Sequence, residues 1–201
     1  PTLSVFLPNG DFAGIYLNGG NYNIIGKMAL AGRNKKETWD QWYTGRFDLH
    51  PMKGLSVKGD YSWNRYSTVQ KFHRKEMTQT FPEGRDPYLV ETPNYVRNYN
   101  SNNIYQAINV WAEYKKSFND VHNLSLMAGY NQEEKTYAST SYTMTDLYDN
   151  EMPISDLAIN YKENEEGSDI WRVQGAFFRL NYDYRSKYLL EVNGRYDGSS
   201  K

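Results

Sequence analysis

The stretch that decides the fold is Leu55-Ser56-Val57-Lys58-Gly59-Asp60-Tyr61-Ser62-Trp63-Asn64, where polar residues alternate with apolar residues, aromatic residues and one glycine. Successive side chains of an extended strand point to opposite faces, so this stretch places an apolar row on one face and a polar row on the other. The sequence therefore predicts a β-strand that separates two different environments.

The same alternation occurs in five further stretches, so we expect six strands and an all-β fold. These stretches are 39–49, 103–117, 123–135, 170–184 and 188–197. Gln106 is a polar exception within an otherwise apolar row. The phase of the alternation changes near Phe177-Phe178. We expect either a bulge or the end of the apolar row at that point.

The lengths of the connections favour a membrane barrel. Three connections are short, at 50–54, 118–122 and 185–187, and two are long and polar, at about 66–102 and 136–169. Outer-membrane barrels have tight periplasmic turns and longer extracellular loops, whereas a compact soluble domain seldom holds two long structureless links. We therefore divide the chain into an extracellular loop region, 1–38, and a region of barrel strands with long loops, 39–201.

Strand length and composition point the same way. The strand at 103–117 would rise roughly 38 Å at about 3.3 Å per residue and a tilt near 40°, which exceeds the hydrocarbon layer. The chain has 19 Tyr among 201 residues, and Tyr and Trp collect at membrane interfaces. We expect an antiparallel transmembrane β-barrel segment. Because alternation also fits a sheet with one face on a soluble core, a soluble or surface-exposed β-rich carbohydrate-binding module is the alternative.

Several kinds of chemistry are disfavoured by composition. The formal net charge is −1 and cysteine is absent, so we expect no nucleic-acid partner and no thiol chemistry. No Ser/His/Asp set has a supporting motif, so we do not expect an enzyme. His50, His73 and His122 are too far apart in sequence to suggest a metal site. Acidic residues at 146–156 and 163–169 offer oxygen ligands for Ca²⁺ in an extracellular loop, but the calcium-loop spacing is missing, so solvated carboxylates are favoured.

Aromatic residues in the long links are the candidate ligand contacts, because a flat ring can stack on a sugar or on a peptide side chain. The candidates are Trp39, Tyr66, Tyr88, Tyr95, Tyr99, Tyr137, Tyr142 and Tyr148. For any single one of them, loop packing or a place in the aromatic girdle is favoured over ligand contact. The basic run 71–75 could touch a charged ligand or lipid headgroups, although a solvated loop is the favoured interpretation.

The carboxy-terminal part of the chain resembles a known family. Residues 175–191 followed by 195–201 are similar to the barrel hairpin of the SusC/RagA group of TonB-linked transporters, which reads approximately F-x-R-x-N-Y-x-Y-x-x-K-Y-L-L-E and then R-x-D-G-S-S. The matching residues are Arg179, Tyr182, Tyr184, Lys187, Tyr188, Arg195, Asp197 and Gly198. Segments 54–62 and 122–130 resemble the family more loosely. Segment 8–12 is similar to its loop element Pro-Asp-Gly-x-Tyr, with a departure at Asn9-Gly10-Asp11.

The resemblance implies a bacterial outer-membrane barrel of about 22 strands with a plug. This chain would be an internal fragment of about six strands that supplies wall and extracellular loops. The implied partners are a SusD-like surface lipoprotein, outer-membrane lipid, and TonB acting through a plug region that this sequence lacks. The implied ligand is an oligosaccharide or a peptide, taken up as a nutrient, and no cofactor is implied.

Overall fold

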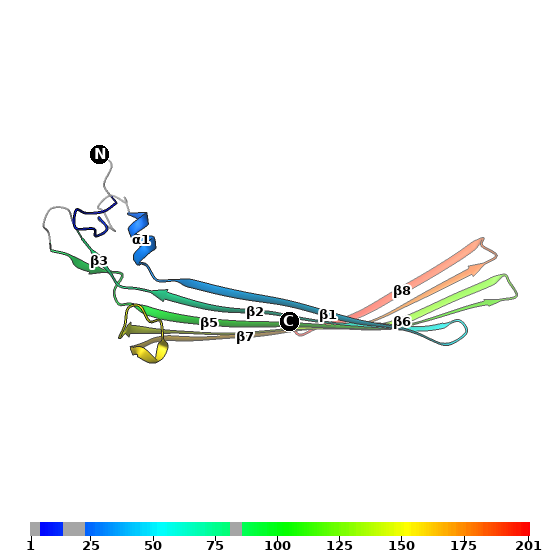
Figure 1. Ribbon diagram of the computed structural model, residues 1–201. Coiled ribbons are helices and arrows are strands. Elements are labelled where there is room, and N and C mark those ends of the chain that lie inside the picture. Colours follow the sequence, from blue (N-terminus) through cyan, green and yellow to red (C-terminus); the bar gives the residue numbers. More distant parts are fainter. Residues whose placement is uncertain (1–4, 14–22, 81–85) are drawn as a thin grey trace. The chain divides into compact units, whose positions relative to one another are not determined.

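The computed structural model of the protein describes residues 5–13, 23–80 and 86–201. Its main feature is a six-stranded antiparallel sheet with the order β1-β2-β5-β6-β7-β8 (Figure 1). The strands are β1 (Asn34–Met52), β2 (Leu55–Arg74), β5 (Tyr95–Phe118), β6 (His122–Leu147), β7 (Ala158–Tyr184) and β8 (Tyr188–Ser199). All six predicted stretches lie inside these strands, and the all-β prediction is confirmed.

Smaller elements occupy the connections. Helix α1 (Ile24–Leu30) begins after Asn23, whose side chain accepts a hydrogen bond from the Gly26 backbone N–H at 3.0 Å. Strands β3 (Met77–Gln79) and β4 (Tyr88–Val90) pair antiparallel, and a 3₁₀ turn, η1, spans Ser155–Leu157. Across the described parts of the chain, none of the helices has the length and apolar character needed to cross a membrane.

The strands are longer than the alternation predicted. The predicted long links at 66–102 and 136–169 were wrong in their bounds, because β2 continues to Arg74, β5 begins at Tyr95, and β6 and β7 extend to Leu147 and from Ala158. The links that remain are 75–94 and 148–157. The extensions escaped detection because polar side chains, which interrupt the apolar rows, pair across strands there: Arg97 Nε donates to Ser141 Oγ at 3.0 Å.

The predicted extracellular region, 1–38, also overlaps the sheet, since β1 begins at Asn34. Within that region residues 1–4 and 14–22 lie outside the described residues, as do residues 81–85 of the first predicted link. Whether 1–38 is extracellular stays a prediction.

The chain forms two compact units. The first unit comprises Pro1–Glu37, Thr68–Asn100 and Ser139–Glu166, and the second comprises Thr38–Ser67, Ser101–Ala138 and Gly167–Lys201. Helix α1, the β3–β4 pair and η1 all belong to the first unit. The short turns belong to the second unit. The side-chain contacts of the first unit differ from those of the second unit.

An apolar face and a polar face are separated in the second unit, as the alternation predicted. On the apolar face the rings of Tyr43 and Trp63 lie 5.7 Å apart, and the ring of Phe178 packs against Gly194. The polar exception on this face is paired, since Tyr61 Oη donates to Gln106 Oε1 at 2.7 Å. A satisfied amide is much less costly on an apolar face than an unpaired one.

The polar face carries a ladder of side-chain hydrogen bonds that runs across three neighbouring strands. Asn109 Nδ2 donates to Asp60 Oδ1 at 2.8 Å, and Asn131 Nδ2 donates to Asn109 Oδ1 at 2.7 Å. Asn131 is buried, so its amide group depends on this partner. The ladder links β2, β5 and β6 through side chains as well as through the backbone.

The pairing of β7 with β8 has no bulge at the phase change near Phe177-Phe178. The β7–β8 pairing proceeds one residue at a time from Val173↔Ser199 to Tyr184↔Tyr188. The alternative prediction, that the apolar row ends near this point, fits the side chains better. On the side of Phe178 toward Gly167, Gln174 Oε1 accepts from Tyr130 Oη at 3.1 Å and Arg172 Nε donates to Glu134 at 2.6 Å.

Glycine at position 59 provides room for a cross-strand ring, and this gives a first prediction. A Cβ at Gly59 would lie 2.6 Å from the Phe47 ring and 2.8 Å from the Asn109 carbonyl oxygen, whereas a Cβ at Gly45 would meet nothing within 4 Å. We expect Gly59→Ala to cost roughly 1–3 kcal/mol of unfolding free energy. Gly45→Ala should instead be stabilising by up to about 1 kcal/mol. Urea unfolding followed by tryptophan fluorescence would measure both, and equal effects would contradict the packing.

Candidate functional site

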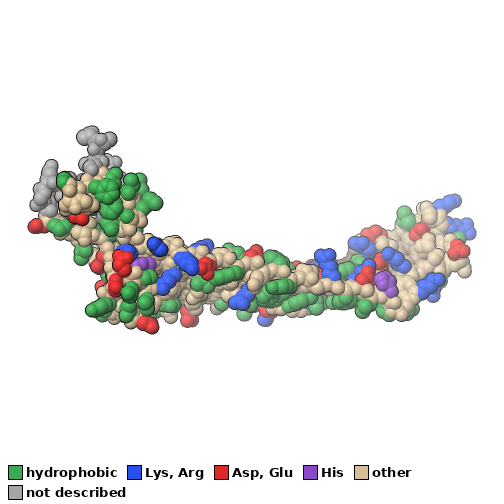
Figure 2. Space-filling model, in the orientation of Figure 1, with side chains coloured by type: hydrophobic (Ala, Val, Ile, Leu, Met, Phe, Trp, Pro, Cys, Tyr) green, Lys and Arg blue, Asp and Glu red, His purple; other side chains and the backbone are tan. Residues whose placement is uncertain are grey.

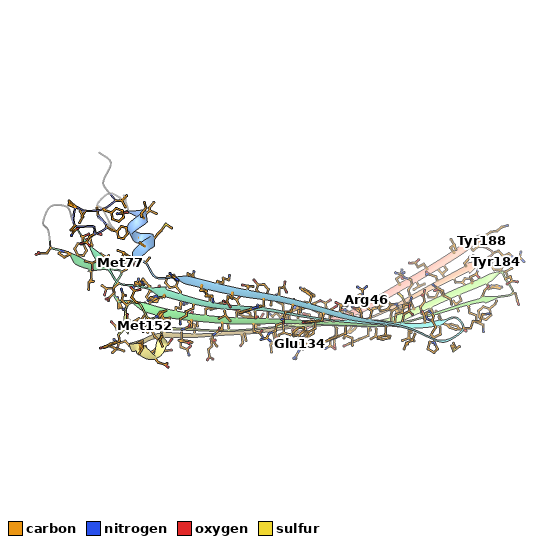
Figure 3. All side chains as sticks on the ribbon, viewed as in Figure 1. Arg46, Met77, Glu134, Met152, Tyr184 and Tyr188 are labelled. Atoms are coloured by element: carbon orange, nitrogen blue, oxygen red, sulfur yellow. The ribbon has the colours of Figure 1, made fainter. Side chains whose placement is uncertain are left out.

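The hairpin that carries the family resemblance is held by its own side chains. Tyr184 and Tyr188 lie on either side of the turn with ring centroids 6.4 Å apart (Figure 3). His122 adds to this aromatic cluster, since its Nδ1 lies 2.6 Å from Tyr182 Oη and its ring 5.0 Å from that of Tyr184. These tyrosines collect at a short turn, where a girdle would lie in a membrane barrel.

The remaining residues of the resemblance have contacts that stabilise the hairpin. Arg179 Nε donates to Asn193 Oδ1 at 2.9 Å, and Arg195 Nε donates to both oxygens of Asp197 at 2.7 and 2.9 Å. Two further residues of the resemblance have backbone contacts. The Lys187 N–H donates to the Tyr184 carbonyl in the turn, and Gly198 is opposite Gln174 in the β7–β8 pairing. These contacts give the hairpin a structural role.

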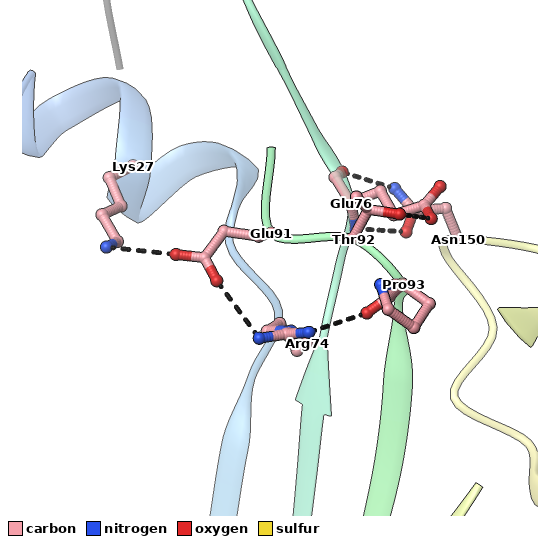
Figure 4. A network of polar contacts seen from close by, with 7 residues as sticks. All are labelled: Lys27, Arg74, Glu76, Glu91, Thr92, Pro93 and Asn150. Atoms are coloured by element: carbon pink, nitrogen blue, oxygen red, sulfur yellow. Dashed lines mark hydrogen bonds and ion pairs between the residues drawn. The ribbon is translucent and has the colours of Figure 1, made fainter. Parts of the chain in front are cut away.

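In the first unit, a polar network connects α1 to the end of β2 and to the link 75–94 (Figure 4). Glu91 forms ion pairs with Lys27 at 3.6 Å and with Arg74 at 3.4 Å. Arg74 Nη2 also donates to the Pro93 carbonyl at 2.9 Å. One guanidinium therefore holds both the carboxylate and the backbone of the same link.

Two asparagines tie the links to neighbouring backbone: Asn150 joins the link 148–157 to the link 75–94, and Asn94 joins the link 75–94 to the end of β6. Asn150 Oδ1 accepts from the Glu76 N–H at 2.8 Å, and Asn150 Nδ2 donates to the Glu76 carbonyl at 2.9 Å. The buried Asn94 pairs in the same two-bond manner with the backbone of Leu147, at 2.7 and 3.2 Å. In both places a side-chain amide forms the two hydrogen bonds that the backbone of a neighbouring strand would otherwise form.

Two of the predicted ligand contacts come together in the first unit. Tyr95 and Tyr99 line a hollow of about 370 Å³ together with Gln70, Phe72 and Arg97. Phe72 belongs to the basic run singled out in the sequence. Arg97 was missed, because it lies on β5 among polar residues that carry no motif. We call this hollow the aromatic hollow.

The other six candidates do not join the aromatic hollow. Trp39 lies in β1, Tyr66 in β2, Tyr88 in β4, Tyr137 and Tyr142 in β6, and Tyr148 in the link that follows. Most of the eight are therefore strand residues, not loop residues as predicted, because the strands are longer. Tyr148 is 86% exposed. Whether any of the eight touches a ligand stays a prediction.

The metal predictions are not decided by the fold. Over the ranges that the structure describes, no three His, Asp or Glu side chains come close enough together to hold a metal ion. Among the acids of the predicted acidic loops, Asp146 accepts hydrogen bonds from Asn160 and Thr145, and these lower the pKa of its carboxyl group. The suggestion of Ca²⁺ in an extracellular loop stays a prediction.

His73 is the buried titratable group of the first unit. It is 5% exposed, and among the described residues its Nε2 has no hydrogen-bond partner. Burial, with help from the charge of Lys75, lowers the pKa of His73 from its usual value, and the opposing attraction of Glu151 does not reverse this. The neutral imidazole is therefore the form that the folded unit favours.

The fold and the faces of the sheet define a class of protein. The chain forms a six-stranded antiparallel sheet of the kind found in the barrel of TonB-dependent transporters. No family model matches the chain. Over 90 residues it is 29% identical to a TonB-dependent receptor of Formosa agariphila, a match that covers 44% of this chain and 9% of that receptor.

Solved structures of a peptide transporter share the fold of this chain. The RagAB peptide transporter matches with a TM-score of 0.75 and 18% identity, over 96% of this chain and 21% of the matched chain. The RagAB peptide importer in its open-open and closed-closed states matches with the same values. The resemblance to the SusC/RagA group is confirmed, and the matched proteins are a receptor and a transporter, not enzymes. The chain spans only about a fifth or less of their length.

The contact of Asn94 with Leu147 gives a second prediction. In Asn94→Ala the backbone N–H and C=O of Leu147 lose their partners, at a cost that corresponds to a rise of roughly ten- to a hundredfold in the exchange rate of the Leu147 amide. The control Asn98→Ala removes a nearby asparagine, in β5, that bonds to Ser155 instead. Hydrogen exchange at Leu147 should not change in that variant. Equal exchange in both would contradict the anchoring role.

The lowered pKa of His73 gives a third prediction. The unfolded chain takes up the proton near pH 6.5 and the folded unit only at lower pH, so stability is full above about pH 6.5 and declines as the pH falls below it. We expect protease cleavage in the link 75–94 to increase from pH 7.5 to pH 5. His73→Gln should flatten this dependence. His50→Gln, at an exposed site on β1, should leave it as in the parent, and an unchanged slope in His73→Gln would refute the assignment.

Proposed function

We propose that this chain forms part of the wall and the external loops of a TonB-dependent outer-membrane importer of nutrient oligomers. The observation that carries the proposal is the separation of faces in the second unit: a predominantly apolar face lies opposite a face where polar side chains pair across strands, as in the ladder from Asp60 to Asn131. In a membrane barrel the apolar face meets lipid and the polar face meets the lumen.

Burial supports this proposal over the soluble carbohydrate-binding module. Within the described residues the buried hydrophobic side chains are Met77, Val96, Ala107 and Leu147. Large hydrophobic side chains remain exposed along the strands (Figure 2), among them Tyr43 at 63% and Leu190 at 55%. A soluble module would need to bury such a face in its own core, because large exposed apolar patches are rare on monomeric soluble proteins.

The second unit is the part that we assign to the hydrocarbon layer. Its strands carry the apolar face, and its aromatic cluster at Tyr184 and Tyr188 suits the headgroup level. The first unit, with its polar network and links, we assign to the extracellular side. This assignment agrees with the family resemblance, in which long loops are external and short turns periplasmic.

The partners and the ligand follow from the same proposal. The solved RagAB structures are of a peptide transporter, so a peptide is the favoured ligand and a glycan the second choice. A SusD-like surface lipoprotein would cover the external side. TonB would act through a plug outside this chain. The chain would supply wall and loops, with no chemistry of its own.

The fourth prediction tests the lipid-facing assignment in the full-length protein. Leu126 lies on the apolar face and Ser125, its neighbour in β6, on the polar face, where its Oγ contacts Glu113. Leu126→Arg should cost about 2–4 kcal/mol near the bilayer midplane. Ser125→Arg should cost clearly less, because its charge meets water and an acidic neighbour. Unfolding in lipid vesicles would measure both. If Leu126→Arg folds as stably as Ser125→Arg, the apolar face does not meet lipid.

A further inference from the structure

The aromatic hollow is built from two neighbouring strands of the first unit. Gln70 and Phe72 come from β2, and Tyr95, Arg97 and Tyr99 come from β5. Within each strand these residues alternate with others, so they share one face of the sheet. The hollow therefore combines an aromatic wall with one guanidinium and one side-chain amide.

Stacking keeps the aromatic wall in place. The rings of Phe72 and Tyr95 are 5.5 Å apart and nearly parallel, at 27°. The Arg74 guanidinium lies 4.5 Å from the centre of the Tyr95 ring, and the Glu91 and Pro93 contacts described above hold that guanidinium. A wall fixed in this way loses little side-chain entropy when a ligand binds.

Arg97 already binds a carboxylate that belongs to the chain. Its Nε donates to Ser141 Oγ at 3.0 Å, which fixes the guanidinium, and its Nη2 meets Glu165 Oε2 at 3.3 Å. The side chains of Arg97 and Glu165 are 45% and 58% exposed. Exposed ion pairs contribute about 0–1 kcal/mol, so Glu165 is readily displaced. Glu165 thus shows where a ligand carboxylate would sit.

Gln70 supplies a complementary acceptor. Its Nε2 donates to Asn34 Oδ1 at 2.7 Å, which leaves its Oε1 as the group that can accept from a ligand. A peptide offers both parts that this arrangement recognises: N–H donors for Gln70 and a carboxylate for Arg97. A neutral sugar offers hydroxyl groups, which a guanidinium with donors only satisfies less well.

We propose that the aromatic hollow binds an acidic peptide. A ligand carboxylate takes the place of Glu165 on Arg97, while an apolar or aromatic ligand side chain lies against Phe72 and Tyr95. The inference rests on the proposed importer function and adds a ligand class and a built-in competitor to it. Its distinctive consequence concerns the ion pair of Arg97 and Glu165. Removal of the Arg97 charge should lower the affinity for the peptide, whereas removal of the Glu165 charge should raise it.

Binding by the full-length protein in detergent tests the proposal. The probe is N-acetylated Gly-Ala-Tyr-Ala-Glu-Glu, whose binding is followed by isothermal titration calorimetry, and its neutral counterpart ends in Gln-Gln amide. Arg97→Gln should weaken binding of the acidic probe about tenfold, and Glu165→Gln should tighten it about threefold. Neither should change binding of the neutral peptide by that much. The control Arg172→Gln also breaks an Arg–Glu pair, with Glu134, but outside the hollow, and should bind as the parent does.

Other outcomes overturn the proposal. If Arg97→Gln binds the acidic probe as tightly as the parent, or Glu165→Gln binds it less tightly, the hollow is not the carboxylate site. Displacement of the probe from the hollow by maltohexaose at equal concentration would assign the hollow to sugars. Uptake of either peptide by cells that carry the protein tests the importer function separately. If the cells take up neither peptide but binding still depends on Arg97, the importer function is refuted and the binding site is retained.

Discussion

Backbone pairing between long antiparallel strands is the constraint on which the other contacts of this protein depend. Because the β7–β8 register runs without interruption, every second side chain stays on one face from Val173 to Tyr184. A slip of one residue would move the rings of Tyr182 and Tyr184 to the polar face and place the Arg179 guanidinium on the apolar one. The separation of faces is therefore a property of the register as much as of the composition.

Cross-strand contacts reinforce that register on both faces of the second unit. The ladder from Asp60 through Asn109 to Asn131 joins three strands on the polar face. On the apolar face the Phe47 ring occupies the space that Gly59 leaves open. A large ring beside a glycine in the neighbouring strand specifies which residues are opposite each other. These contacts give a wall whose two surfaces can meet different solvents.

The first unit uses the same pairing for a different purpose. There the side chains that tie the links are polar: Asn94 and Asn150 each pair with a stretch of backbone, and Arg74 holds Glu91 and Pro93. Ordered links keep neighbouring side chains in fixed positions, which is what a binding surface needs. The aromatic hollow lies in this unit and takes its orientation from two paired strands and not from a loop.

The amino-acid sequence by itself determined that six strands form, where each is centred and which face of each is apolar, because alternation with a period of two is a local property. It also carried the family resemblance, in the hairpin from Arg179 to Gly198. Strand ends were not determined, since the polar extensions beyond Arg65 and Asn102 are stabilised only by neighbouring strands. Only the tertiary structure decided that Gln106 is paired by Tyr61 and that Arg97 joins Phe72, Tyr95 and Glu165. Such contacts join residues from different strands, and the pairing that brings them together is a property of the folded chain.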